Sequence, residues 1–182
     1  MKRILITLLG LIIAVSPSFA QFQQTPRASV DWNGIKLPDN TVIAISFEIE
    51  NAKFGGLSYK DRVAVDPELA TDLPDAVQRC VDSANHEMKK WVQSYRPQTI
   101  FFTAETEGRE YHIHFIVKSV WSDGYTIADA TFTTPTGVAI FSNLRGPGGQ
   151  YGSFVNLMGD GFESLGKEVA KRIQKARERR KI

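Results

Sequence analysis

The sequence predicts an α+β domain in which two long amphipathic helices pack on one face of a mainly antiparallel sheet of four to five strands. Three observations predict it. Short segments between turn signals alternate apolar and polar residues, as strands with one buried face do. Residues 74–95 and 153–173 repeat apolar residues every three or four positions, as amphipathic helices do. Because one helical segment precedes most of the strands and the other follows them, both apolar stripes can cover one face.

The first twenty residues have the layout of a secretory signal peptide. Lys2 and Arg3 give a positive start, residues 4–15 are apolar, and small residues end at Ala20. The apolar run is shorter than the roughly 20 residues that cross a bilayer. We therefore expect residues 1–20 to be removed by cleavage after Ala20, and the product to be periplasmic or secreted.

The composition after that cleavage excludes some function classes. The full chain has 22 basic and 20 acidic residues, so loss of Lys2 and Arg3 leaves a formally neutral chain. A neutral chain lacks the basic field that nucleic-acid binding needs, and we expect no nucleic-acid partner. An apolar fraction of 42% indicates a globular protein. We expect an extended lead-in over residues 21–40 and one domain over residues 41–182.

The single cysteine, Cys80, constrains both stability and location. One cysteine cannot form an intrachain disulfide, and none follows Ala20, so we expect no lipoprotein anchor. No second apolar stretch reaches spanning length, which predicts no membrane span. Cys80 lies on the apolar stripe of the first helix, where it is expected to fill the core rather than to react.

The expected strands follow one another around turn signals. Asp123-Gly124 suits a two-residue hairpin, and residues 135–137 make a second turn, so the strands around them form an antiparallel meander. Residues 51–72 contain Gly55-Gly56 and Pro67 and are expected to be an exposed connection. The segments expected to be strands are residues 41–50, 99–106, 110–121, 125–133 and 138–142.

Capping signals place the ends of the two helices. Asp72 can cap the first helix, Pro74 suits its first turn, and Pro97 ends it. Ser153 opens the second helix. Its internal glycines at 159, 161 and 166 are expected where the helix lies very close to the sheet, or where it restarts at Asp160.

The sharpest chemical pattern is a carboxylate and two imidazoles on one strand. Glu110, His112 and His114 have period-two spacing, which places them on the same side. Such a set could ligate zinc or another divalent metal with an open position. The structural alternative is a polar sheet surface that faces water.

A glycine-rich segment precedes the second helix. It lacks the lysine of a phosphate loop, although the following helix start could hold an anion. A flexible connection is the simpler interpretation, and a partner-binding loop is one form of it. The residues proposed for partner binding are Arg145, Gly146, Gly148, Gly149, Gln150 and Tyr151.

Catalytic signatures are weak throughout the sequence. No serine lies in a G-x-S-x-G elbow, so the pattern predicts no catalytic residue and no cofactor. The basic tail at residues 177–181 suits a solvated helix end, where cations complement the helix dipole, or an acidic surface.

The C-terminal part of the chain resembles known envelope domains. Residues 125–130 (YTIADA) and 136–141 (TGVAIF) are followed by the glycine-rich loop and a helix that ends at residues 166–173 (GKEVAKRI). This order resembles the final strand–turn–strand–helix portion of small bacterial envelope domains of the curli-secretion-component and TolB-amino-terminal type. The resemblance implies a sheet-plus-helices fold that serves assembly or interaction rather than catalysis. Unlike many of those domains, this chain lacks a lipoprotein cysteine.

Two functions are consistent with these patterns. The first is an exported, non-enzymatic protein that binds an envelope or extracellular protein through the uncovered sheet face or the glycine-rich loop. The second is a metal- or small-ligand-binding protein, with enzymatic activity as an option, that uses Glu110, His112 and His114. The sequence leaves the partner and the oligomeric state open.

Overall fold

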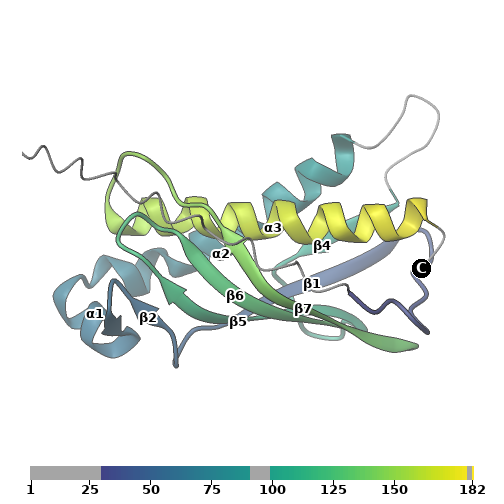
Figure 1. Ribbon diagram of the computed structural model, residues 1–182, viewed down its shortest axis with the longest axis horizontal. Coiled ribbons are helices and arrows are strands. Elements are labelled where there is room, and N and C mark those ends of the chain that lie inside the picture. The colour runs from purple at the N-terminus through teal and green to yellow at the C-terminus, as the bar shows by residue number, and fades with distance from the viewer. Residues whose placement is uncertain (1–29, 91–98, 180–181) are drawn as a thin grey trace, which may run out of the picture.

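The computed structural model describes residues 30–90, 99–179 and 182, and these form one α+β unit. Its mixed sheet has seven strands, and three helices accompany it within the described residues. Helices α2 (Glu68–Lys90) and α3 (Phe154–Glu178) lie side by side on one face of the sheet (Figure 1). The predicted packing of two amphipathic helices on one face is therefore confirmed. No helix among the described residues is both long and apolar enough to cross a membrane.

The first half of the sheet is parallel, which corrects the prediction of a mainly antiparallel sheet. Strand β1 (Thr41–Glu48) lies between β4 (Ile100–Thr103) and β5 (Tyr111–Val120) and runs parallel to both. The reason is the helix that joins β1 to β4, because a helical crossover returns the chain in the same direction. Alternating burial is the same for parallel and antiparallel strands, so the sequence pattern did not show the direction.

The second half of the sheet is the predicted antiparallel meander. Strand β5 pairs with β6 (Thr126–Thr134), and β6 pairs with β7 (Gly137–Gly146). Gly124 has a φ of 79°, which suits the expected turn between β5 and β6. The main sheet order is therefore β4–β1–β5–β6–β7, with β5 at its centre.

The segment predicted to be an exposed connection contains three short elements. Strands β2 (Lys53–Phe54) and β3 (Leu57–Ser58) form a hairpin, and β2 extends the edge of β5 beyond the end of β1. Helix α1 (Tyr59–Val65) follows, with the Ser58 hydroxyl accepting a hydrogen bond from the N–H of Asp61 at its start. Helix α1 has no buried residue, so no apolar period marked it in the sequence.

The connection from β4 to β5 crosses β1. Thr103 ends β4 level with Ala44, and β5 begins one position away, opposite Ile43. Because the two strands flank β1, residues 104–110 must pass over it. Ala44 lies on the face opposite the helices and is nevertheless fully buried, which places the crossing on that face.

Helix α2 begins earlier than predicted. Its first residue is Glu68, so Pro67 rather than Pro74 stands at the helix start. Pro74 lies inside the helix and leaves the carbonyl of Ala70 without its helical partner. Both residues are exposed, so water can bond that carbonyl. The predicted helix end near Pro97 falls in residues 91–98, outside the described residues.

Helix α3 is continuous and does not restart at Asp160. Ser153 caps it by accepting a hydrogen bond from the N–H of Asn156, as predicted. A Cβ at Gly161 would overlap the Gly124 carbonyl and the Thr126 hydroxyl at the edge of the sheet. The expected close approach to the sheet is therefore confirmed at this glycine. Gly159 and Gly166 instead face helix α2.

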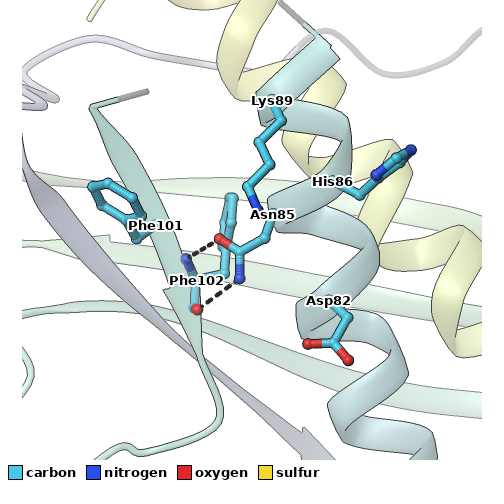
Figure 2. A pocket seen from close by; sticks show the side chains of 6 residues that line it. All are labelled: Asp82, Asn85, His86, Lys89, Phe101 and Phe102. Atoms are coloured by element: carbon cyan, nitrogen blue, oxygen red, sulfur yellow. Dashed lines mark hydrogen bonds between the residues drawn. The ribbon is translucent and has the colours of Figure 1, made fainter. Parts of the chain in front are cut away.

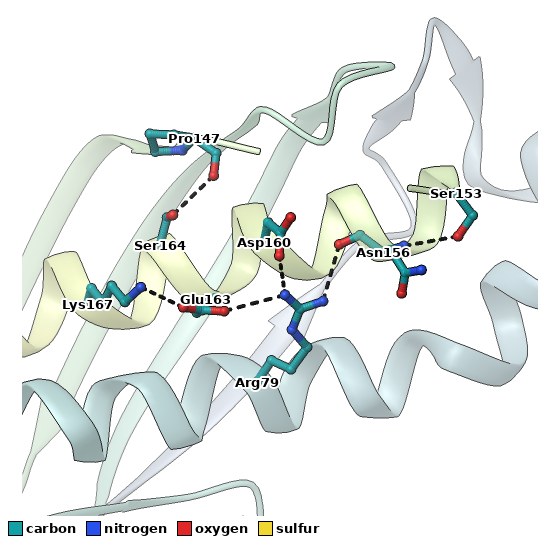
Figure 3. A network of polar contacts seen from close by, with 8 residues as sticks. All are labelled: Arg79, Pro147, Ser153, Asn156, Asp160, Glu163, Ser164 and Lys167. Atoms are coloured by element: carbon teal, nitrogen blue, oxygen red, sulfur yellow. Dashed lines mark hydrogen bonds and ion pairs between the residues drawn. The ribbon is translucent and has the colours of Figure 1, made fainter. Parts of the chain in front are cut away.

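A polar network fastens the start of α3 to α2 and to the loop before it (Figure 3). The Arg79 guanidinium of α2 donates to the carbonyl of Asn156 and pairs with the carboxylates of Asp160 and Glu163. The Ser164 hydroxyl donates to the carbonyl of Pro147 at 3.0 Å. The hydrogen bond and positive charge of Lys167, and then those of Arg79, lower the pKa of Glu163.

The core lies between the sheet and the two helices. Phe47 of β1 stacks between Phe115 of β5 and Phe162 of α3, with ring centroids 4.7 and 4.4 Å away. Part of the predicted lead-in also enters the core, because Trp32, Ile35 and Leu37 are buried. Trp32 meets Phe141 of β7 edge to face at 5.7 Å. Residues 30–40 therefore pack as part of the domain, and the expected signal peptide lies outside the described residues.

Candidate functional site

The face of the sheet opposite the helices carries the two predicted histidines, and we call it the open face. Ile113 and Phe115 of β5 are fully buried under the helices, so His112 and His114 point to the other side. The parallel register places Ala44 beside His112 and Ser46 beside His114. The sequence predicted the side of β5 on which the histidines lie, but it did not predict their neighbours on β1.

One serine hydroxyl bridges the two imidazoles. The Ser46 Oγ lies 2.8 Å from His112 Nε2 and 2.8 Å from His114 Nδ1. The other nitrogen of His114, Nε2, lies 3.5 Å from the Glu48 carboxylate. We call Ser46, Glu48, His112 and His114 the histidine cluster.

Donor counting assigns a direction to this chain of contacts. A hydroxyl has one proton to donate, so Ser46 can donate to only one of the two imidazoles, and the other imidazole must donate to the Ser46 oxygen if both contacts are hydrogen bonds. A carboxylate only accepts, so His114 Nε2 carries a proton toward Glu48 and His114 Nδ1 accepts from Ser46. His112 Nε2–H then donates to Ser46. The assigned chain runs from His112 through Ser46 and His114 to Glu48.

The environment favours the neutral form of His112. Desolvation by burial lowers the pKa of His112, and its repulsion with His114 lowers it further. A neutral His112 matches the single-donor role that the hydrogen-bond chain requires. His112 therefore presents a hydrogen-bonding group rather than a positive charge at neutral pH.

The predicted metal set is not assembled as expected. Glu110 precedes β5 and is exposed, and the carboxylate that approaches the histidines is Glu48 of β1. Within the described ranges, no group of three or more His, Cys, Asp or Glu side chains is arranged to hold a metal ion. Alternation along β1 predicted that Ser46 and Glu48 lie on the polar face. It did not predict the parallel pairing of β1 with β5, which brings these two residues next to the histidines. Metal binding by the histidine pair stays a prediction.

Large apolar side chains are exposed on both sides of the histidine cluster on the open face, toward β4 and toward β7. Ile140 of β7 is 61% exposed and pairs with Thr131 of β6, which pairs with His114. Val138 is 52% exposed and is related to His112 in the same way through Thr133. We call the following residues the apolar rim: Phe101 of β4, Ile116 of β5, Val138 and Ile140.

The charges next to the histidine cluster are mostly acidic. Lys118 and Asp129 form an ion pair at 2.7 Å, and Arg109 pairs with Glu105 at 2.6 Å. These contacts neutralise Lys118 and Arg109, and two further bases, Lys53 and Arg145, are exposed further along the same face, level with Ser119 and Ile127. The acidic residues that remain are Glu48 in the cluster and Glu107 and Glu110 in the connection over β1.

The residues predicted for partner binding lie in two different settings. Arg145 and Gly146 belong to β7, and the rest belong to the loop before α3. A Cβ at Gly148 would overlap the Asp123 carbonyl, and one at Gly149 would overlap the Asp160 carboxylate. These glycines therefore allow close packing against the β5–β6 turn and α3. Gln150 and Tyr151 are exposed, and Tyr151 is 89% exposed.

A hollow of about 580 Å³ lies between α2 and β4 (Figure 2). The Asn85 carboxamide at its floor bonds the main chain of Phe102. His86 and Lys89 of α2 border the hollow and are exposed, as predicted for the polar side of this helix. Cys80 is buried on the opposite side of α2, and burial raises the pKa of its thiol. Cys80 is therefore a core residue, as predicted.

Comparison with known proteins adds no relative. No family model, no curated protein and no solved structure matches the chain.

Proposed function

We propose that this chain is an exported, non-enzymatic domain that binds another envelope or extracellular protein through its open face. The observation that carries the proposal is the apolar rim of four large, exposed side chains around the histidine cluster. Exposed apolar residues that gather on one face of a protein mark interaction sites more often than singly scattered ones do.

The polar centre of the face supports docking more than chemistry. The hydrogen bonds of Ser46, His112 and His114 are mostly made within the cluster, so a partner can cover them without leaving buried groups unpaired. The Ser46 hydroxyl contacts His114, whose other ring nitrogen faces the Glu48 carboxylate, but these half-buried groups lie on the surface of a sheet rather than in a water-excluded cleft.

Charge indicates the kind of partner surface. Glu48, Glu107 and Glu110 give the part of the open face next to the histidine cluster an acidic border, because Lys118 and Arg109 are paired there and Lys53 and Arg145 lie further along the sheet. Complementary charge steers association and fixes orientation. We therefore propose a partner protein that offers apolar side chains to Val138 and Ile140 and basic side chains to the border.

Site-specific photo-crosslinking in the native cells tests the proposal. A photo-reactive residue at Thr131, between Ile140 and His114, should trap one defined protein. The same residue at Lys171, exposed on α3, is the matched control and should trap none. Glu48→Lys should weaken the Thr131 adduct and leave the melting temperature within a few degrees. Crosslinks from Lys171 alone, or none from Thr131, would overturn the proposal.

A second candidate function rests on the convergence of two imidazole nitrogens on one point. His112 Nε2 and His114 Nδ1 both reach the Ser46 oxygen at 2.8 Å, so a small rearrangement could direct them to one zinc ion. Zinc titration of untagged protein tests this candidate. Micromolar binding that disappears in His112→Ala/His114→Ala would support metal binding and would argue against a purely polar cluster.

A further inference from the structure

The two edges of the main sheet differ in how they are protected. Strand β4 forms one edge and has only four residues, Ile100–Thr103. The Asn85 side chain from α2 donates to the Phe102 carbonyl and accepts from the Phe102 N–H, each at 2.9 Å (Figure 2). An incoming strand therefore finds the outward main-chain groups of Phe102 already occupied.

Strand β7 forms the other edge and is not protected in this way. Its ten residues pair with β6 alone among the strands that the structure describes. Exposed edges usually carry lysine, acidic residues or proline that discourage pairing with another chain. Strand β7 has none of these, and its only charged residue, Arg145, is next to its end. Val138 and Ile140 are both more than half exposed beside this edge.

A bulge limits the regular part of the edge. The register between β6 and β7 shifts after the Ala130–Phe141 pair, and Asn143 has a φ of 50°. The Asn143 N–H is bonded by the Asp129 carboxylate at 2.7 Å. Residues 137–142 are therefore the part of β7 that can continue the sheet in a straight ladder.

The described part of the lead-in, residues 30–40, packs next to β7 but leaves the hydrogen-bonding edge of residues 137–142 accessible. Trp32 packs on Phe141, and the Ile35 side chain lies where a Cβ of Gly137 would point. Phe141 and Gly137 face the helix side of the sheet, because they alternate with the exposed Val138 and Ile140. Among the described residues 30–40, the lead-in therefore covers the helix-facing side of β7 and not its hydrogen-bonding edge.

We propose that a second copy of this chain pairs with β7 through an antiparallel ladder around a two-fold axis. An antiparallel edge is self-complementary, because each copy supplies the donors and acceptors that the other needs. The two copies overlap most fully when the axis lies near the middle of residues 137–142. Because directly opposite residues must also share a face, the axis passes between two copies of Ala139 or between two copies of Ile140. With the axis at Ala139, Val138 of one copy lies opposite Ile140 of the other on the open face. With the axis at Ile140, the two Ile140 side chains lie opposite each other, and each Val138 lies opposite Ser142.

Charge supports a copy of the same chain as the occupant. The two-fold axis places the two Arg145 side chains at opposite ends of the ladder, so no like charges meet within residues 137–142. The paired sheet would join the two open faces into one surface. The pairing is argued from the hydrogen-bonding edge of β7 and not from the function proposed above, although it places Val138 and Ile140, which belong to the proposed partner surface, at the junction of the two copies.

Sedimentation velocity over a range of concentrations tests the pairing. The protein is purified from the cells that make it, and mass spectrometry identifies its N-terminal residue. We expect a monomer–dimer equilibrium, and Ile140→Lys should weaken it at least tenfold by bringing two charges together. Phe101→Lys is the matched control, because Phe101 is exposed on the same face at the opposite edge. A monomer at every concentration, or equal weakening by Phe101→Lys, would overturn the proposal.

A crosslink distinguishes this dimer from any other. Two copies of residue 140 would lie about 5 Å apart in one register and about 7–8 Å apart in the other. Ile140→Cys should therefore give a covalent dimer with a short bismaleimide, while buried Cys80 stays unlabelled. Thr103→Cys on β4 should give none. A dimer that crosslinks only through Thr103→Cys, or a monomer with a protected β7 edge, would contradict the pairing.

Discussion

Asn85 hydrogen-bonds both main-chain groups of Phe102, with its amide nitrogen 2.9 Å from the carbonyl oxygen and its amide oxygen 2.9 Å from the N–H. The carboxamide thus imitates the peptide group of a neighbouring strand. Helix α2 is fastened by this contact to the edge of β4, to which it is also connected in sequence. The contact stabilises the fold and closes one edge of the sheet.

Asn85→Ala should lower the free energy of unfolding by about 1–3 kcal/mol, because it leaves two half-buried main-chain groups without partners. Urea unfolding measures the change. Asn85→Asp keeps the acceptor and loses the donor, so it should fall between the wild type and the alanine variant. Asp82→Ala, on the exposed side of the same helix, should change stability by less than about 0.5 kcal/mol. Equal effects at the two positions would refute this role of Asn85.

Gly166→Ala should destabilise the fold although alanine is the better helix former. A Cβ at Gly166 would overlap the Cys80 carbonyl of α2, so the two helices must separate. Overpacking of this kind costs about 1–3 kcal/mol, which exceeds the roughly 1 kcal/mol that alanine gains in helix propensity. Thermal unfolding measures the net effect. Lys171→Ala on the exposed side of α3 is the control, and a Gly166→Ala variant more stable than wild type would show that the helices are not in contact there.

Stability should depend on pH through His112. Burial and the neighbouring His114 lower the pKa of His112 in the folded state, so the unfolded chain takes up its proton first as pH falls. The contribution is fully present above the unfolded pKa of about 6.5 and is lost as pH falls from there through the folded pKa. Urea midpoints between pH 7.5 and pH 5 measure the loss.

His112→Gln should flatten that profile, and His86→Gln should leave it unchanged because His86 is exposed on α2. A wild-type profile that is already flat would mean that His112 protonates equally well in both states. A steep profile that survives in His112→Gln would assign the dependence to another group.

Cys80 should react with iodoacetamide only when the domain unfolds. The side chain is fully buried, and burial raises the pKa of the thiol, so the thiolate is scarce in the folded state. Labelling followed by mass spectrometry should increase with urea in parallel with the loss of helix signal. Rapid labelling of the native protein would show that α2 opens without global unfolding.

Sequence periodicity predicted which side chains face the helices but not how the strands run. Ile113 and Phe115 are buried and His112 and His114 are not, as alternation along β5 required. The pairing of β1 with β5 depends on the path of the chain through α2, which side-chain patterning does not record. The contact between Ser46 and the two histidines follows from that pairing, so the sequence alone could not show it.

Two further differences have local causes. Pro74 satisfies the sequence signal for a helix start, yet Pro67 occupies that position, because an exposed proline inside a helix can leave its orphaned carbonyl to water. The glycine-rich segment was expected to be a free connection. Gly148 and Gly149 instead lie against the main chain near Asp123 and the side chain of Asp160, which only a structure reveals.

The passage of residues 104–110 over β1 imposes an order on assembly. Strands β4 and β5 are close in sequence and parallel, so they could pair directly with each other and leave β1 outside the sheet. In the native arrangement β1 lies between β4 and β5 under this connection, so we expect folding to be fastest when β1 is in place before β4 and β5 pair with it. Synthesis from the N-terminus makes β1 and α2 before β5, so we expect it to favour the native pairing over direct pairing of β4 with β5. A chain that refolds from denaturant has all strands present at once and must escape that misfolded pairing.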